Sequence, residues 1–229
     1  MDGNRLSLFP SHKLAFAAVI AACAMACTAS AGLAQQGTTM ISIEKMDVGK
    51  APADFEFART GQGGPAQWVV VSDPSVTGVR AIEQSSTDQT DYRFPLAIYK
   101  PVSTKNGEVT VRFKAVAGKI DQAAGIAMRL VDPDNYYVVR ANALEDNVRF
   151  YRMVKGKREQ LEGANVKVSG NEWHTLGLKA EGERFTVTYN GKLLFTTSDS
   201  TFKDAGRIAL WTKADSVTRF DRIEITTRQ

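Results

Sequence analysis

The sequence predicts an all-β protein built as a two-layer antiparallel sandwich. Through most of the chain after residue 34, apolar residues recur with a period of two rather than 3.6, which is typical of half-buried strands. Gly, Pro and Asn turn signals separate these stretches, and no stretch has the length and spacing of a convincing helix. Because successive strands are joined by tight hairpins, a parallel α/β sheet is also excluded.

Ten segments are rich in Val, Ile, Phe, Tyr and Thr, the residues that suit a pleated, half-buried surface. In chain order, the predicted strands are 68–71, 108–114, 125–131, 136–140, 147–154, 174–179, 184–189, 192–196, 206–211 and 219–226. Asn190-Gly191 lies between two alternating runs and is the strongest hairpin signal, because both turn positions need a positive φ. Residues 35–39 are expected to be a frayed start, and only 121–124 and 141–146 have room for a helical turn.

The first 34 residues differ in composition from the rest and predict a secretory signal peptide. Arg5 and Lys13 give a positive start, residues 14–27 form a short uncharged apolar stretch, and small residues with A-x-A-like cleavage sites follow. A membrane span is the alternative, but the uncharged stretch only just reaches that length and its second half is mostly small residues. The predicted organisation is a signal peptide at 1–34 and one sandwich domain at 35–229, periplasmic or secreted.

Ile20-Ala21-Ala22-Cys23 also resembles a lipoprotein processing box, in which the cysteine would be acylated. The chain stays apolar for several residues beyond Cys23 and offers ordinary cleavage sites, which favours soluble export. We therefore expect no membrane contact unless Cys23 carries a lipid, and we expect the domain to be a monomer.

Composition excludes several kinds of chemistry from the predicted domain. Both cysteines, Cys23 and Cys27, lie in the predicted signal, which leaves no disulfide, thiolate nucleophile or Cys-ligated zinc. His12 is lost with the signal, so His174 is the single remaining histidine and a His-rich metal site is excluded. The formal net charge of +4 is mild, and the chain lacks the basic stripe that nucleic-acid binding needs.

Several stretches carry a resemblance to a known family. They are DQAAGIAMR at 121–129, NYYVVRANALEDN at 135–147, WTKADSVTRFD at 211–221, and EWHTL at 172–176 with YNGKLLF at 189–195. The chain resembles bacterial exported proteins of the concanavalin A-like lectin/glucanase superfamily, and most closely its laminin-G-like and 3-keto-disaccharide hydrolase-type domains. The resemblance covers most of the chain after the signal, and it implies a two-sheet jelly roll with a concave sheet face.

One motif of that superfamily is missing. Its glucanases carry Glu-x-Asp-x-x-Glu on one strand, whose alternation points the nucleophile and the general acid into the cleft. No glutamate in this chain is followed by Asp at +2 and Glu at +5. The retaining-glucanase mechanism is therefore disfavoured, and the resemblance leaves open whether the domain is an enzyme.

Polar residues inside the predicted strands mark a candidate ligand surface. Alternation turns Met128 and Leu130 toward the core and Arg129 toward the outer, concave face of the sheet. The same alternation places Trp211 and Lys213 on this face, and Arg140 and Asn142 join them if the sheet curves as it does in the family that the chain resembles. The ligand-binding candidates are therefore Arg129, Arg140, Asn142, Trp211 and Lys213. Arginine and asparagine supply directional hydrogen bonds, and an indole supplies a stacking surface for a sugar. Alternatively, these residues form cross-strand pairs that only stabilise a solvated face.

Three carboxylates beside the same strand ends are the candidates for catalysis. They are Glu145, Asp146 and Asp215. The first functional hypothesis is an exported carbohydrate-binding domain that recognises an oligosaccharide or polysaccharide on the concave face. The alternative is a glycan hydrolase of the 3-keto-disaccharide hydrolase type that uses carboxylates outside the glucanase motif. A structural or adhesion domain without a small-molecule ligand is the third possibility.

The remaining aromatic and acidic motifs are interpreted structurally. We expect Trp173 to pack in the core and its neighbour His174 to lie at the surface on the opposite face. Trp68 is compatible with either place. Asp132-Pro-Asp-Asn135 could donate oxygens to calcium, but it lacks the spaced carboxylates of a tight site, and a plain turn is favoured. No cofactor is predicted.

Overall fold

The computed structural model of the protein describes Met1 and residues 36–228. The predicted signal peptide at 1–34 therefore lies outside the described residues apart from Met1. Within 36–228 the chain forms fifteen strands and one short 3-10 helix, and no α-helix. None of the described segments is a helix long and apolar enough to cross a membrane.

The strands vary from five to twelve residues in length. In chain order they are β1 (Gln36–Met40), β2 (Phe55–Gly61), β3 (Trp68–Ser72), β4 (Arg80–Gln84), β5 (Arg93–Thr104), β6 (Asn106–Ala117), β7 (Ala123–Asp132), β8 (Asn135–Asn142), β9 (Asn147–Val154), β10 (Lys157–Asn165), β11 (His174–Glu181), β12 (Arg184–Tyr189), β13 (Lys192–Ser198), β14 (Gly206–Trp211) and β15 (Val217–Arg228). The 3-10 helix η1 (Ile43–Lys45) follows β1.

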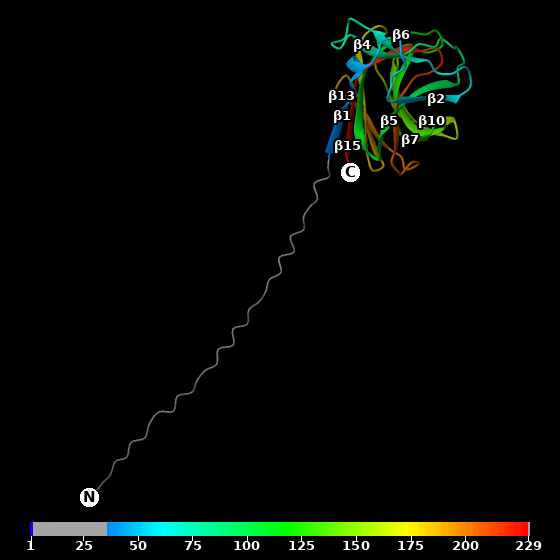
Figure 1. The fold of residues 1–229 in the computed structure, drawn as a ribbon. Coiled ribbons are helices and arrows are strands. Elements are labelled where there is room, and N and C mark those ends of the chain that lie inside the picture. The colour runs from blue at the N-terminus through cyan, green and yellow to red at the C-terminus, as the bar shows by residue number, and fades with distance from the viewer. Residues whose placement is uncertain (2–35, 229) are drawn as a thin grey trace. The chain divides into compact units, whose positions relative to one another are not determined.

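These strands form two antiparallel sheets that pack as a jelly-roll sandwich (Figure 1). The eight-stranded sheet has the order β13-β12-β11-β6-β15-β4-β3, and β1 also pairs with β15. The seven-stranded sheet has the order β10-β9-β8-β7-β14-β5-β2. Long strands from the middle and the end of the chain, β6 and β15, lie side by side at the centre of the eight-stranded sheet.

All ten predicted strands are confirmed, but the sequence patterns missed five others. Two of them, β4 and β5, are mostly buried and lack a clear alternation, whereas β10 is a polar edge strand with the sequence KREQLEGAN. The expected frayed start is wrong, because residues 36–40 pair in register with 224–228. Neither 121–124 nor 141–146 is helical. The first segment ends in β7, and the second begins in β8 and continues as a turn.

The space between the sheets holds the main hydrophobic core. Alternate residues of β8 enter it, among them Tyr137 and Val139, and they meet Phe185 and Leu178 from the facing sheet. The ring of Tyr137 lies 4.5 Å from that of Phe185, centre to centre. Trp68, left undecided by the sequence, belongs to this core and packs on Phe220.

A second apolar cluster covers the other face of the seven-stranded sheet. Its members alternate along the strands with those of the main core: Phe94, Leu96, Ile98, Ala123, Ala127, Leu130, Tyr136, Val138, Tyr151, Met153, Ala209 and Trp211. A sheet face exposed to water would not hold this many buried apolar residues. The seven-stranded sheet is therefore buried on both faces over most of its area.

The curl of the seven-stranded sheet buries this second cluster. The hydroxyl of Tyr92, the residue before β5, donates to the Gly156 carbonyl and accepts from the N–H of Arg158, both at 2.9 Å. The Thr60 hydroxyl of β2 contacts the Pro133 carbonyl and lies 2.7 Å from the Tyr136 hydroxyl. These contacts join opposite corners of one sheet, because β2 and β10 are its two edge strands. The face that they fold over is concave.

Arg129 does not lie on the concave face, and the predicted position is wrong. A bulge interrupts β7, with Arg129 at φ 49° and a register shift against β8 between Met128 and Asp132. The bulge turns Leu130 to the concave face and sends Arg129 toward the other sheet. There its guanidinium donates to the carbonyls of Lys105 (2.9 Å), Phe202 (2.8 Å) and Gly182, and 1 % of the residue is exposed. Burial lowers its pKa.

Arg129→Met should lower the free energy of unfolding by about 3 kcal/mol, because three carbonyls lose a charged donor in a buried place. Arg129→Lys keeps the charge but reaches fewer carbonyls, and it should lose less. The exposed Arg184 at the start of β12 supplies the control, Arg184→Ala, which should change stability by less than about 0.5 kcal/mol. Urea unfolding followed by tryptophan fluorescence measures all three, and a parent-like midpoint for Arg129→Met would contradict this role.

Candidate functional site

Polar side chains, both buried and exposed, gather at one end of the concave face, where β7 and β9 begin and β8 and β14 end. We name this group the rim cluster. It consists of Asp91, Asp121, Arg140, Asn142, Glu145, Asn147 and Lys213. Antiparallel pairing produces the gathering, because Asn142 of β8 faces Asn147 of β9 and Ala123 of β7. The apolar cluster of the concave face ends here, and charged groups take its place.

Arg140 is the fixed donor of the rim cluster. Its guanidinium donates to Glu145 Oε2 at 2.7 Å, to Asn147 Oδ1 at 2.9 Å and to the Tyr151 hydroxyl at 3.2 Å. Only 4 % of Arg140 is exposed, whereas 46 % of the Glu145 side chain is. The buried Arg140 Nε has no partner among the described residues. Burial would raise the pKa of Glu145, but Arg140 and Asn147 outweigh it and lower that pKa.

Lys213 bridges two carboxylates at the other side of the cluster. Its Nζ lies 2.5 Å from Asp91 Oδ1 and 2.9 Å from Asp121 Oδ2. The contact with Asp121 is an ion pair without the geometry of a hydrogen bond, and Asp121 Oδ2 accepts no hydrogen bond from the described residues. Burial would lower the pKa of Lys213, but both carboxylates outweigh it and raise that pKa. Burial raises the pKa of Asp121 despite its cation.

Asn142 connects the two halves of the rim cluster. Its amide donates to Asp121 Oδ1 at 2.7 Å, and its carbonyl oxygen accepts the N–H groups of Leu144 (2.9 Å) and Glu145 (3.2 Å). Asparagine commonly stabilises a turn through its side chain in this way. The turn places Glu145 over Arg140, so Asn142 shapes the site rather than facing solvent.

Trp211 faces the concave side as predicted, but it offers no surface to a sugar. It is fully buried, and its ring stacks on Phe94 at 5.2 Å with an interplanar angle of 18°. Its indole N–H donates to the Tyr136 hydroxyl at 3.2 Å. Gly125 on the neighbouring strand leaves room for the ring, since a Cβ there would lie 3.1 Å from it. The predicted stacking role is contradicted, because the closed corner covers the indole.

Arg158 takes part in the concave face although the sequence patterns did not identify it. Its guanidinium lies 5.0 Å from the ring centre of Phe94 and 4.6 Å from that of Tyr151. Its Nη1 is buried without a partner among the described residues. Asp91 and Asp121 were missed as well, because both lie in loops, where no periodicity assigns a side chain to a face.

The three predicted catalytic carboxylates lie in different places, and only Glu145 belongs to the rim cluster. Asp146 turns away to an exposed ion pair with Lys167 (2.9 Å) and accepts the N–H of Val168 (3.1 Å). Asp215 is 3 % exposed, and its carboxylate accepts the N–H groups of residues 119, 120 and 121. Asp215 therefore holds the loop that carries Asp121, and Asp146 joins the β8–β9 turn to the segment that follows β10.

Trp173 and His174 lie on the opposite sides from those expected. His174 is 7 % exposed and packs in the core between Phe113 and Tyr189, with Nε2 3.0 Å from the Ser169 carbonyl. Trp173 is half-buried on the outer face of the eight-stranded sheet. Strand β11 begins at His174, whose side chain points into the core. Because neighbouring residues of a strand point to opposite faces, the side chain of Trp173 points outward.

The segment Asp132–Asn135, for which a plain turn was favoured over a calcium site, forms a turn between β7 and β8. Asp132 Oδ1 accepts the N–H of Asp134 at 2.7 Å and the amide of Asn135 at 2.9 Å, as in a plain Asp-initiated turn. Among residues 36–228, no three His, Cys, Asp or Glu side chains converge into a group that could hold a metal ion.

Solved structures of several carbohydrate-active proteins share the fold. The carbohydrate-binding module CBM66 of Bacillus subtilis is 19% identical, with a TM-score of 0.56 over 73% of this chain and 94% of that chain. The β-glucanase of Bacillus licheniformis is 13% identical, with a TM-score of 0.54 over 84% and 99%. Domain 4 of a Geobacillus stearothermophilus arabinanase, solved with arabinotriose, is 13% identical, with a TM-score of 0.53 over 82% and 91%. At these identities the likeness shows the fold.

The sequence comparison with protein families is more specific. No curated protein matches the chain. A family described as the 3-keto-alpha-glucoside-1,2-lyase-like domain matches residues 50–226, which is most of the sandwich. The resemblance stated from the sequence, to 3-keto-disaccharide hydrolase-type domains of the concanavalin A-like superfamily, is thereby confirmed. The chain is a carbohydrate-related jelly-roll domain, and it belongs to the 3-keto-alpha-glucoside-1,2-lyase-like domain family.

Proposed function

We propose that the protein binds a saccharide at the rim cluster. One observation carries this proposal. At one end of the concave sheet face, the exposed carboxylates of Asp91 and Glu145 lie in one cluster with the Lys213 ammonium and the buried guanidinium of Arg140. Asp91 exposes 73 % of its side chain and Glu145 exposes 46 %, while Lys213 exposes 12 %. The remainder of the concave face is closed by the corner contacts, so the ligand binds at the rim and not along the whole face.

The donors and acceptors of the rim cluster suit sugar hydroxyls. A hydroxyl group donates one hydrogen bond and accepts others, so it can bridge a carboxylate and an ammonium group. Glu145 and Asp91 are the acceptors, and Lys213 is the donor. Arg140 holds Glu145 in one orientation, which reduces the ordering cost of binding.

The structural neighbours support a saccharide as the ligand class. One of them is a carbohydrate-binding module, and another was solved in complex with arabinotriose. The family description names an α-glucoside, so a glucose-containing saccharide is the first choice for the ligand.

The proposal includes export to the periplasm or the medium. The positive start, the apolar stretch and the small-residue cleavage sites of residues 1–34 support it. In the described residues β1 begins at Gln36, the second residue after the predicted cleavage position.

Cleavage of a 3-keto-glucoside is the second candidate function. Two observations favour it: the family match, and the placement of a cationic Lys213 and the carboxylate of Glu145 in one cluster. A ketone at C3 acidifies the hydrogen on C2. Glu145 would take that proton, while the Lys213 ammonium stabilises the negative charge that develops on the C3 oxygen.

The electrons then complete an elimination. The C3 carbonyl re-forms, a double bond forms between C1 and C2, and the C1–O bond to the aglycone breaks. The departing oxygen receives a proton, which Glu145 can return. Addition of water across the new double bond would make the overall reaction a hydrolysis, without the glucanase motif.

Binding at the rim cluster should weaken about tenfold in Glu145→Gln and in Asp91→Asn, because each removes a charged acceptor for a sugar hydroxyl. NMR titration of the domain with short glucans and arabinans measures the dissociation constants. Asp146→Asn is the matched control, since it changes the adjacent residue, whose side chain points away. Parent-like affinity of both rim variants would contradict the site.

Export predicts a shortened protein. When the full chain is produced in a bacterial host, the mature protein should begin at Gln35 and leave the cytoplasm, and intact-mass measurement identifies the new terminus. A protein retained in the membrane with a lipid mass on Cys23 would instead establish the lipoprotein alternative.

A 3-keto-α-glucoside incubated with the domain should yield the free aglycone and a C1–C2 unsaturated ketone, followed by ultraviolet absorbance and NMR. Glu145→Gln should reduce the rate about 100-fold or more. The rate should stay constant as the pH falls, until it passes below 4.5, the ordinary pKa of a glutamate, because the base acts as a carboxylate and its pKa is lowered. A rate that declines already near neutral pH would contradict Glu145 as the base.

A further inference from the structure

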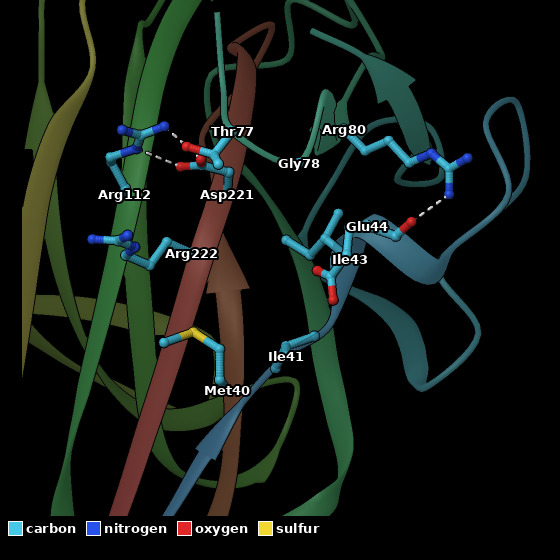
Figure 2. Close-up of a pocket in the computed structure, with 10 residues that line it drawn as sticks. All are labelled: Met40, Ile41, Ile43, Glu44, Thr77, Gly78, Arg80, Arg112, Asp221 and Arg222. Atoms are coloured by element: carbon cyan, nitrogen blue, oxygen red, sulfur yellow. Dashed lines mark hydrogen bonds and ion pairs between the residues drawn. The ribbon is translucent and has the colours of Figure 1, made fainter. Parts of the chain in front are cut away.

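A cavity of about 440 Å³ opens on the side of the sandwich away from the rim cluster. It lies where the end of β1 and helix η1 pass the outer face of β15 and β6, and Thr77 and Gly78 close it from above (Figure 2). Three arginines line it, one each from β4, β6 and β15: Arg80, Arg112 and Arg222. None of the sequence patterns pointed to this place.

Arg222 reaches the cavity because of a β-bulge. The register of β15 against β6 shifts between Asp221 and Ile223, and Arg222 has a φ of 36°. A positive φ is unfavourable for a residue with a side chain, and such residues gather at functional sites. The bulge lets the consecutive residues Asp221 and Arg222 both line the cavity, which regular alternation would prevent.

The charge of the cavity is not balanced internally. Arg112 and Asp221 neutralise each other through a two-point contact at 2.7 and 2.6 Å. Arg80 donates to the backbone carbonyls of residues 44 and 46 and to no carboxylate in the described part of the chain, where Arg222 likewise makes no ion pair. Apart from the Arg112–Asp221 pair, the lining residues carry two positive charges, Arg80 and Arg222, and one negative charge, Glu44. The cavity therefore has an excess positive charge.

A tryptophan ring flanks the same place. Trp173 is half-buried, and the guanidinium of Arg112 lies 4.9 Å from its ring centre. Its indole N–H donates to the Ser75 hydroxyl at 2.9 Å, in the loop that also supplies Thr77 and Gly78. The Lys114 ammonium also lies over this ring, at 4.8 Å from its centre, so Trp173 holds two cations beside the cavity without lining it.

We propose that this cavity is a second ligand site, which binds the carboxylate of an acidic saccharide through Arg222. Asp221 neutralises Arg112 on the neighbouring strand, so Arg222 is the cation left for the carboxylate, and the saccharide ring lies toward the side of the cavity next to Trp173 (Figure 2). The site lies on the opposite sheet from the rim cluster, so it does not depend on the function proposed there.

Titration of the full domain with an oligogalacturonate, a neutral galacto-oligosaccharide and inorganic sulfate tests this site. The oligogalacturonate should bind, and its affinity should fall about tenfold in Arg222→Gly. Glycine adopts the bulge conformation without strain, so this variant should keep or raise the melting temperature. Glu44→Gln should bind more tightly, since it removes the single opposing charge.

Two control variants distinguish this site from the rim cluster and from a general attraction of the anion to surface arginines. Arg184→Ala removes an exposed arginine elsewhere, and Glu145→Gln changes the rim cluster; both should bind the oligogalacturonate as the parent does. No binding of oligogalacturonate, or equal binding by Arg222→Gly, would overturn the proposal. Equal affinity for the neutral oligosaccharide or for sulfate would overturn the assignment to an acidic saccharide. If Glu145→Gln lost oligogalacturonate binding while Arg222→Gly kept it, the acidic saccharide would bind at the rim cluster, and the proposed second site would be wrong.

Discussion

The curl of the seven-stranded sheet is the constraint on which the other features of the concave face depend. Its opposite corners are joined by the hydroxyls of Thr60 and Tyr92, which bond to the turns that follow β7 and β9. This closure buries the stacked rings of Phe94 and Trp211 and leaves only the rim open to solvent. A carbohydrate site in this chain is therefore confined to the end of the face, where polar groups replace the apolar cluster.

The polar groups at that end are arranged so that few buried charges lack a partner. Arg140 is almost fully buried and bonds to one carboxylate, one amide and one hydroxyl, while Asp121 has both Lys213 and Asn142. Removing one member would leave the others buried and unpaired, which costs more than the pair contributes. The exposed members, Asp91 and Glu145, are the ones free to exchange a protein contact for a ligand contact.

Sequence periodicity predicted the sheet class, ten strands and the common face of Trp211 and Lys213, and the family resemblance added Arg140 and Asn142 to that face. It failed at Arg129, because a bulge reverses alternation and leaves no mark in the residue types. It assigned the correct face to Trp211 but not its burial, since corner contacts between distant segments close over the ring. Asp91 and Asp121 were missed because both lie in loops, where no period assigns a side chain to a face.

The pairing of β1 with β15 sets the order in which the domain can be completed. The first strand, from Gln36, lies in register with the last, which ends at Arg228, and β15 also supplies the partner of β4 and β6. A chain that emerges from its N-terminus must therefore wait for its final residues before the centre of the eight-stranded sheet can form. The eight-stranded sheet is thus held together by strands from the two ends of the domain, whereas no strand of the seven-stranded sheet pairs with either of them.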